Sequence, residues 1–200
     1  MTTFSAYAAN FDTYPKEGEA LRRLAPLLDS LKRVDFLLRV ADPSRNQGQM
    51  DSDLDIRLEQ SILALGASSF MLRMPRTTPQ KLDFAFMFAG QKVAVEIEKA
   101  NREKILRDFL KCHVYLHAGA DFALVVLPKN YVHKLGIWNL FEFGVHLFDD
   151  CRRYGFGTED NLGRILLVGY EQLLASTNQS LSVKTRQEIR ETLIRSAELS

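Results

Sequence analysis

The stretch "LDFAFMFAGQKVAVEIEKAN", residues 82–101, contains two apolar runs separated by the dipeptide Ala89–Gly90. The runs are rich in Phe, Val and Ile, which favour strands, and a short Gly-containing turn between such runs predicts a β-hairpin. Because side chains alternate along a strand, Glu96 and Glu98 share one face of the second strand. A two-residue turn would place Asp83 directly opposite Glu96 on that face, whereas an odd-numbered loop would send Asp83 to the far side.

Three carboxylates that converge at the end of one hairpin repel one another, and burying an ionised carboxylate is costly. A hard divalent cation relieves this repulsion, and Mg²⁺ accepts one or two carboxylates together with water and phosphate oxygens. The competing interpretation is a solvated hairpin face with incidental charge. Positive segments flank the hairpin and favour the metal interpretation, because a negative metal pocket between positive segments suits phosphate-backbone cleavage. These residues are Arg73, Arg76, Lys81, Lys99, Arg102, Lys104, Arg107 and Lys111.

The remaining periodicity predicts a mixed α/β chain. Residues 17–40 carry apolar residues at helical spacing, and a second helix follows Asp51 or Asp53 as its cap. A strand at 69–74 precedes the hairpin; Asn101 is expected to cap a helix over 102–119, and a central strand covers 121–128. Later segments predict a helical region near 137–155, a strand at 163–169 and a charged helix at 182–199. This order indicates a mixed sheet flanked by helices.

The totals describe an ordinary soluble chain. Its 200 residues suit a single domain over 1–200, and the net charge of +1 restricts any nucleic-acid surface to a local patch. Cys112 and Cys151 lack the spacing of a disulfide framework or a zinc site. Neither a signal peptide nor an apolar run of membrane-spanning length is present, so we expect a cytoplasmic protein that does not enter a membrane.

The order of elements resembles the core of the PD-(D/E)XK nuclease superfamily over about residues 51–129, with helical segments 17–40 and 136–200 flanking it. Within that superfamily, "VEIEKAN" resembles the strand end of the BamHI/BglII-like type II restriction endonucleases. The following "REKILRDFLKCHVYLHAGADFALVVLPK" resembles the helix and strand that those enzymes carry. The chain departs from the pattern because no Pro precedes Asp83 and Lys99 falls one residue late, on the other strand face. Glu98 then takes the final motif position.

The resemblance implies a restriction-endonuclease-like α/β core and a Mg²⁺-dependent endodeoxyribonuclease. Asp83, Glu96 and the Ile97 carbonyl would bind Mg²⁺, and Glu98 would bind a metal or orient the attacking water. Glu59 matches an accessory acidic residue near the metal, although it also fits a surface position. An inactivated core that only binds DNA or protein is a further possibility, as is a repair or structure-specific nuclease.

The expected substrate is double-stranded DNA cut at a specific site by a homodimer, with a DNA methyltransferase as a possible partner protein. The segments 17–40 and 136–154 are candidates for the dimer interface, and the same apolar stripes are equally candidates for the core. The candidate DNA-binding residues are Arg73, Arg76, Lys81, Asn101, Arg102, Arg45 and Asn46.

His113 and His117 lie one helical turn apart, next to Cys112, and this spacing raises the alternative of a zinc site. Their apolar neighbours favour histidines of the core or of the helix surface.

Overall fold

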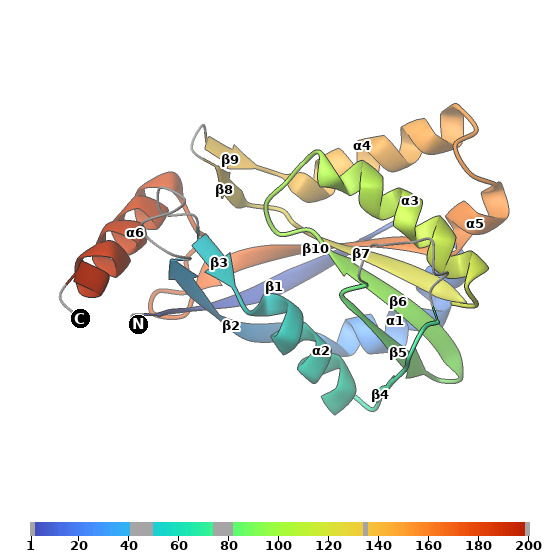
Figure 1. Ribbon diagram of the computed structural model, residues 1–200, viewed down its shortest axis with the longest axis horizontal. Coiled ribbons are helices and arrows are strands. Elements are labelled where there is room, and N and C mark those ends of the chain that lie inside the picture. Colours follow the sequence, from blue (N-terminus) through green and yellow to red (C-terminus); the bar gives the residue numbers. More distant parts are fainter. Residues whose placement is uncertain (1–2, 41–49, 74–81, 134–135, 199–200) are drawn as a thin grey trace.

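A single eight-stranded mixed sheet with the order β3-β2-β1-β10-β7-β6-β5-β4 organises the chain (Figure 1). The computed structural model describes residues 3–40, 50–73, 82–133 and 136–198. Strands β6, β7 and β10 run parallel, and the other neighbours pair antiparallel. The strands are β1 (Phe4–Tyr14), β2 (Arg33–Val40), β3 (Met50–Ser52), β4 (Ser68–Ser69), β5 (Phe84–Phe88), β6 (Gln91–Ile97), β7 (Phe122–Pro128) and β10 (Ile165–Leu174).

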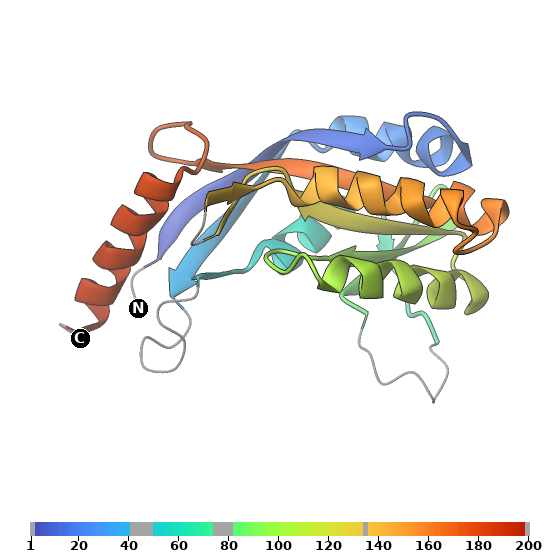
Figure 2. The same cartoon turned by 90° about the horizontal axis from the view of Figure 1, so that it is seen from above.

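Helices cover both faces of this curled sheet (Figures 1 and 2). Helices α3, α4 and α5 pack on one face, and α1 and α2 pack on the other. Helix α6 lies at one end of the molecule, where Ile189 joins the core beside β2. The helices within the described residues are α1 (Glu19–Ser30), α2 (Leu54–Ala64), α3 (Lys104–His117), α4 (Leu140–Arg153), α5 (Glu159–Gly163) and α6 (Val183–Glu198).

A two-stranded hairpin, β8 (Tyr131–His133) and β9 (Gly136–Trp138), leaves the large sheet after β7 and leads into α4. The expected strand at 121–128 is confirmed as β7, a fully buried strand between β6 and β10. The mixed α/β class expected from the sequence is therefore confirmed. No helix within the described residues is long and apolar enough to cross a membrane.

The expectation of a helical segment over 17–40 is correct only for its first half. Helix α1 ends at Ser30, and residues 33–40 form β2, in which Val34, Phe36 and Leu38 are buried in alternation. Val34 also lies three residues after Leu31, so it fits a helical stripe and a strand equally well in isolation. Sheet pairing with β1 and β3 decides in favour of the strand.

Four further outcomes concern strands. Residues 4–14 form β1, a strand that was not predicted. The expected strand at 163–169 is confirmed as β10, which extends to Leu174, and the flanking segment 136–200, otherwise expected to be helical, also contains β9. Of the expected strand at 69–74, only Ser69 belongs to a strand, the two-residue β4, and Met74 lies outside the described residues.

Candidate functional site

The β5–β6 hairpin has the register that the sequence predicts. Phe88 pairs with Gln91 and Phe84 pairs with Val95, so the turn consists of two residues. Ala89 and Gly90 have φ values of 48° and 80°, and a type I′ hairpin turn requires positive φ at both positions. Continuing this register by one residue places Asp83 opposite Glu96.

The carboxylate of Asp83 is anchored to the neighbouring strand. Its Oδ2 accepts a hydrogen bond from the Ile97 N–H at 2.7 Å. Asp83 is partly exposed to solvent. Partial desolvation nevertheless raises the pKa of its carboxyl, and the charge of Asp55 raises it further. The Ile97 hydrogen bond and the cations Lys111 and Lys99 oppose that rise in pKa.

Glu96 lies on the opposite face of β6 from Val95 and Ile97, beneath α3, and is 3% exposed. Lys111 donates to its Oε2, and the Tyr115 hydroxyl donates to its Oε1. Burial raises the pKa of Glu96 to about 7, although both hydrogen bonds favour the ionised form. This carboxyl therefore changes its charge near neutral pH.

Helix α3 supplies the groups that meet Glu96. Asp108, Lys111 and Tyr115 follow at spacings of three and four residues and so share one helix face, and all three are buried. The Lys111 Nζ lies 3.4 Å from Asp108 Oδ1 in addition to its contact with Glu96. In the sequence, Lys111 stands only among the positive charges that flank the hairpin. The one sign that its side chain is buried is its position directly before Cys112, which belongs to the apolar stripe of the helix.

Glu98 is buried but turns into the loop between β6 and α3. Its Oε1 accepts from the N–H groups of Ala100 at 2.9 Å and Asn101 at 2.7 Å. Its charge raises the pKa of Asp108, after the larger effect of burial, so Glu98 remains within electrostatic reach of the cluster. The carboxylate thus stabilises a loop; its expected role at a metal or water stays a prediction.

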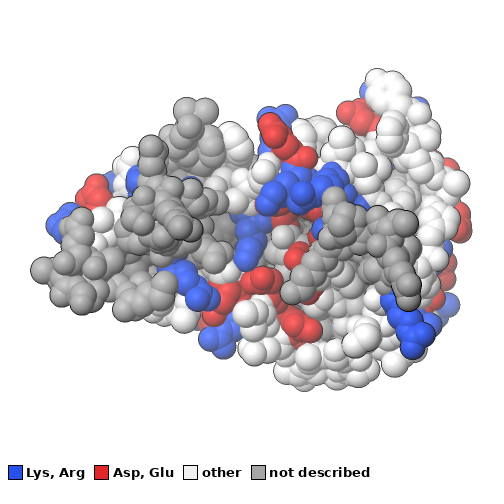
Figure 3. Space-filling model, viewed as in Figure 1, with Lys and Arg blue, Asp and Glu red and all other residues white. Residues whose placement is uncertain are grey.

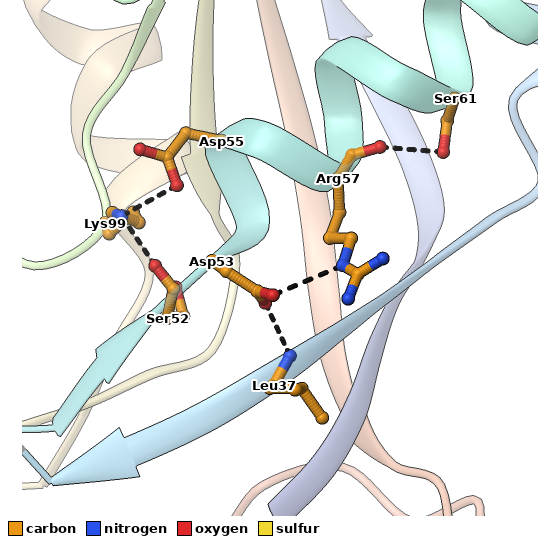
Figure 4. A network of polar contacts seen from close by, with 7 residues as sticks. All are labelled: Leu37, Ser52, Asp53, Asp55, Arg57, Ser61 and Lys99. Atoms are coloured by element: carbon orange, nitrogen blue, oxygen red, sulfur yellow. Dashed lines mark hydrogen bonds and ion pairs between the residues drawn. The ribbon is translucent and has the colours of Figure 1, made fainter. Parts of the chain in front are cut away.

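Lys99 contacts the start of α2, as Figure 4 shows. Its Nζ donates to the Ser52 carbonyl at 2.9 Å and to Asp55 Oδ1 at 3.2 Å. Because β6 ends at Ile97, strand alternation does not fix the direction of Lys99, and its charge reaches Asp83. Because α2 packs on the sheet face opposite α3, this contact agrees with the expectation that Lys99 falls on the other strand face.

Asp53 joins the same region to β2 (Figure 4). It occupies the N-cap position of α2 as expected, but its side chain makes no capping hydrogen bond. Instead, the carboxylate accepts from the Leu37 N–H at 2.7 Å and from Arg57 Nε at 3.2 Å. The start of α2, and with it Asp55, is therefore held at a defined position.

Asp55 is the α2 carboxylate that the structure brings toward the cluster, rather than Glu59. Its charge contributes to the raised pKa of Asp83, and it pairs with Lys99. Glu59 lies one turn further along α2. Among the described residues, no hydrogen bond or ion pair joins it to Asp83, Glu96 or Lys111. The accessory role assigned to Glu59 stays a prediction, with Asp55 better placed for it.

The candidate DNA-binding residues fall into two groups. Arg102 is exposed at the start of α3, with its guanidinium 4.0 Å from the centroid of the Phe143 ring, and Arg73 is exposed in the loop after β4. Asn101 caps the turn before α3 by accepting from the Glu103 N–H at 2.9 Å, whereas α3 itself begins at Lys104. Four others lie outside the described residues: Arg76, Lys81, Arg45 and Asn46.

Positive and negative side chains meet in the middle of the face that Figure 3 shows. The cations that follow the end of β6 in the sequence are Lys99, Arg102, Lys104 and Arg107. Exposed basic groups beside a carboxylate cluster are the arrangement that the sequence analysis expects of a phosphate-binding surface.

The residues of the zinc alternative lie on α3 and differ in exposure. Cys112 is fully buried, and His113 is half-buried with a pKa lowered by burial and by His117. Within residues 3–40, 50–73, 82–133 and 136–198, no three His, Cys, Asp or Glu side chains form a group that could hold a metal ion. Asp83 and Glu96 are thus a pair of oxygen donors, and Mg²⁺ binds to proteins through one or two carboxylates plus water and phosphate.

The apolar stripes considered for a dimer interface are used within the chain. Leu24 and Leu27 of α1 and Phe141 and Phe148 of α4 are buried in the two core clusters. They supply the core, as the alternative interpretation of these stripes holds. The homodimer itself stays a prediction.

Neither a protein-family model nor a curated protein sequence matches the chain.

Proposed function

We propose that the protein is a Mg²⁺-dependent endodeoxyribonuclease built on a restriction-endonuclease-like core. One observation carries the proposal: the hairpin register sets Asp83 opposite Glu96, and a buried lysine of the next helix contacts Glu96. The topology is compatible with such a core, because the hairpin is followed by α3 and by β7, which runs parallel to β6.

The donor set fits a hard cation. Asp83, Glu96 and the Ile97 carbonyl would hold Mg²⁺, whose chemistry is to lower the pKa of a water molecule and to stabilise charge on the phosphate. Lys111 is the cation closest to Glu96, and its ammonium group can hold a water molecule or a phosphate oxygen at the cluster. We therefore assign to Lys111 the orienting role that the sequence pattern gives to Glu98.

The substrate that fits the proposal is double-stranded DNA, cut at a specific site by a homodimer in the cytoplasm. The moderate net charge of +1 supports a specific enzyme over an indiscriminate one, which relies more on a basic surface. A cognate DNA methyltransferase would accompany a restriction enzyme.

One observation favours a second candidate, a core that no longer cuts. Both carboxylate oxygens of Glu96 accept hydrogen bonds from the protein itself, so Lys111 and Tyr115 already satisfy the group that would bind metal. A DNA- or protein-binding domain with this fold would show the same arrangement.

The test incubates long duplex DNA with the wild type, Asp83→Asn and Glu96→Gln, each with Mg²⁺ and with EDTA. Glu188→Gln, a change of an exposed α6 carboxylate, serves as the matched control. Discrete Mg²⁺-dependent fragments that both site variants lose and the control keeps would support a site-specific nuclease. A smear would support a nuclease without sequence specificity.

Absence of cleavage needs a second measurement, because the substrate can lack the target site. Calorimetric titration with Mg²⁺ provides it. Binding that Asp83→Asn abolishes would support an intact site, whereas no binding in the wild type would favour the non-cutting domain.

A further inference from the structure

A groove passes beside the candidate nuclease site, between the β8–β9 hairpin and the loop that joins β6 to α3. Its central hollow of about 690 Å³ is lined by Glu98, Arg102, Lys104, Tyr131, Trp138 and Phe143, and we call it the hairpin groove. Figure 1 shows the hairpin next to the starts of α3 and α4. Because Glu98 lines the groove, the groove lies next to the end of β6, which bears Glu96.

Two smaller hollows extend the groove in both directions. One, of about 270 Å³, shares Glu98, Lys104 and Tyr131 with the centre and adds Arg186 of α6. The other, of about 290 Å³, shares Arg102, Trp138 and Phe143 with the centre. The shared linings make the three hollows neighbours along one path, which suits a chain-like ligand better than an isolated small molecule.

Three aromatic rings line this groove, and guanidinium groups lie against two of them. The Arg186 guanidinium lies 5.3 Å from the Tyr131 ring centroid, and the rings of Tyr131 and Trp138 are 6.4 Å apart at 59°. The Arg102 guanidinium lies over Phe143. The three rings are half-buried and line the central hollow, so a ligand in the hollow can contact them.

The groove carries charges of both signs along its walls. The cations that line the three hollows are Lys99, Arg102, Lys104 and Arg186, and the carboxylates are Glu98, Glu103 and Glu142; Lys99 is paired with Asp55. The Glu98 carboxylate is bound to two backbone N–H groups of the loop, which partly offset its charge. Flat rings and phosphates occur together in unpaired nucleotides, whereas a duplex keeps its bases stacked inside.

We propose that the hairpin groove binds an unpaired DNA strand, with bases against Trp138 and Tyr131 and phosphates against Arg102, Lys104 and Arg186. Only the link to cleavage rests on the proposed function, because strand binding in the groove requires no metal. Next to a nuclease site, this groove would admit substrates with a single-stranded segment. Cleavage of branched or frayed DNA would follow.

The single tryptophan of the chain makes a direct measurement possible, since Trp138 reports on its own surroundings. An oligothymidine of about 12 nucleotides is titrated into the protein in EDTA while tryptophan fluorescence is recorded. We expect saturable quenching. A matched abasic oligonucleotide keeps every phosphate and lacks every base, so it should bind more weakly and leave the fluorescence nearly unchanged. Equal quenching by both strands, or none by either, would overturn the stacking geometry.

Variants are compared by anisotropy of a labelled oligothymidine. Trp138→Ala should weaken binding about 10-fold, since stacking on one aromatic side chain contributes that order of affinity. Tyr154→Ala is the matched control, because Tyr154 is exposed beyond the opposite end of α4. Equal losses in the two variants would contradict the proposal.

Charge variants on the surface test the phosphate contacts without threatening the fold. Lys104→Gln should lower the salt dependence of binding by about 0.7 in the logarithmic slope. Lys184→Gln, which removes an exposed cation at the start of α6, should leave it unchanged. An unchanged slope in Lys104→Gln would show that the strand takes another path.

The two proposals fail in different ways. Quenching in EDTA, combined with neither Mg²⁺-dependent cleavage nor calorimetric binding of Mg²⁺, would preserve the groove and reject the nuclease. Cleavage of duplex DNA without quenching by oligothymidine would preserve the nuclease and reject the groove.

Discussion

The ammonium group of Lys111 on α3 contacts the carboxylate of Glu96 on β6, and both residues are buried. Two charges leave water together, so each depends on the other for its stability in the interior. Asp108 and Tyr115 complete the surroundings of the pair. Glu96 consequently has two partners within the protein before any ligand arrives.

Removing Lys111 should therefore be costly. Lys111→Met leaves the carboxylates of Glu96 and Asp108 without a counter-charge, and we expect a loss of about 3 kcal/mol in the free energy of unfolding. The loss should be greater at pH 8 than at pH 6, because Glu96 can take up a proton at the lower pH. Urea unfolding at both values measures it. Lys104→Met on the exposed side of α3 is the control, and similar losses in both variants would show that the pair is not the cause.

The raised pKa of Glu96 also predicts how stability depends on pH. Between about pH 4.5 and about 7, the folded protein holds a proton on Glu96 that the unfolded chain releases. The free energy of unfolding should fall as pH rises through this window, by no more than about 3 kcal/mol from this group. Glu96→Gln should flatten the fall, and the exposed Glu188→Gln should not. A wild-type curve that rises across the window would contradict the assignment.

Addition of Mg²⁺ should raise the thermal unfolding midpoint of the wild type. A ligand that binds only the folded state stabilises it by about 2.7 kcal/mol at a concentration 100-fold above its Kd. Asp83→Asn removes one oxygen charge from the proposed site and should abolish the shift. Differential scanning calorimetry at constant ionic strength measures both proteins, and an equal shift in each would place the binding elsewhere.

The contact between Lys99 and Asp55 should contribute modestly. The two groups are 29% and 41% exposed, and partly exposed ion pairs contribute at most about 1 kcal/mol. A double-mutant cycle with Lys99→Met and Asp55→Asn should give a coupling energy below that value. A coupling of several kcal/mol would mean that the end of β6 depends on α2 far more than this geometry indicates.

Gly169 in β10 should not tolerate a side chain. A Cβ atom there would lie 2.6–2.8 Å from three ring carbons of Phe141, and a buried ring has little room to move. Gly169→Ala should cost about 1–3 kcal/mol by overpacking. Gly163→Ala, where no atom lies within 4 Å of the added carbon, should have a small effect on the unfolding midpoint. Equal midpoints for the two variants would contradict this packing.

Neighbouring residues were sufficient to predict the hairpin. The apolar alternation of β5 and β6 and the Ala89–Gly90 turn lie within twenty residues, so register and facing side chains follow from local rules. Local rules also predict α3, from its apolar stripe at helical spacing, and β7, from its continuous apolar run.

Strand β2 and strand β1 required the rest of the sheet. The apolar pattern of residues 33–40 fits a helix or a strand, and the hydrogen bonds to β1 stabilise the strand. Strand β1 in turn mixes aromatic residues with Ala, Asn and Asp, and it lies between β2 and β10 and bonds to both. Long-range hydrogen bonds of this kind leave no mark in local sequence.

By itself, then, the sequence determined that Asp83 and Glu96 meet if the hairpin turn has two residues, because the strand period of two then leaves one arrangement. Only the tertiary structure decided what surrounds them. Lys111 reaches Glu96 because α3 packs across β6, and Glu98 turns into the loop because β6 ends one residue earlier. These contacts join separate elements, and their geometry depends on how those elements pack.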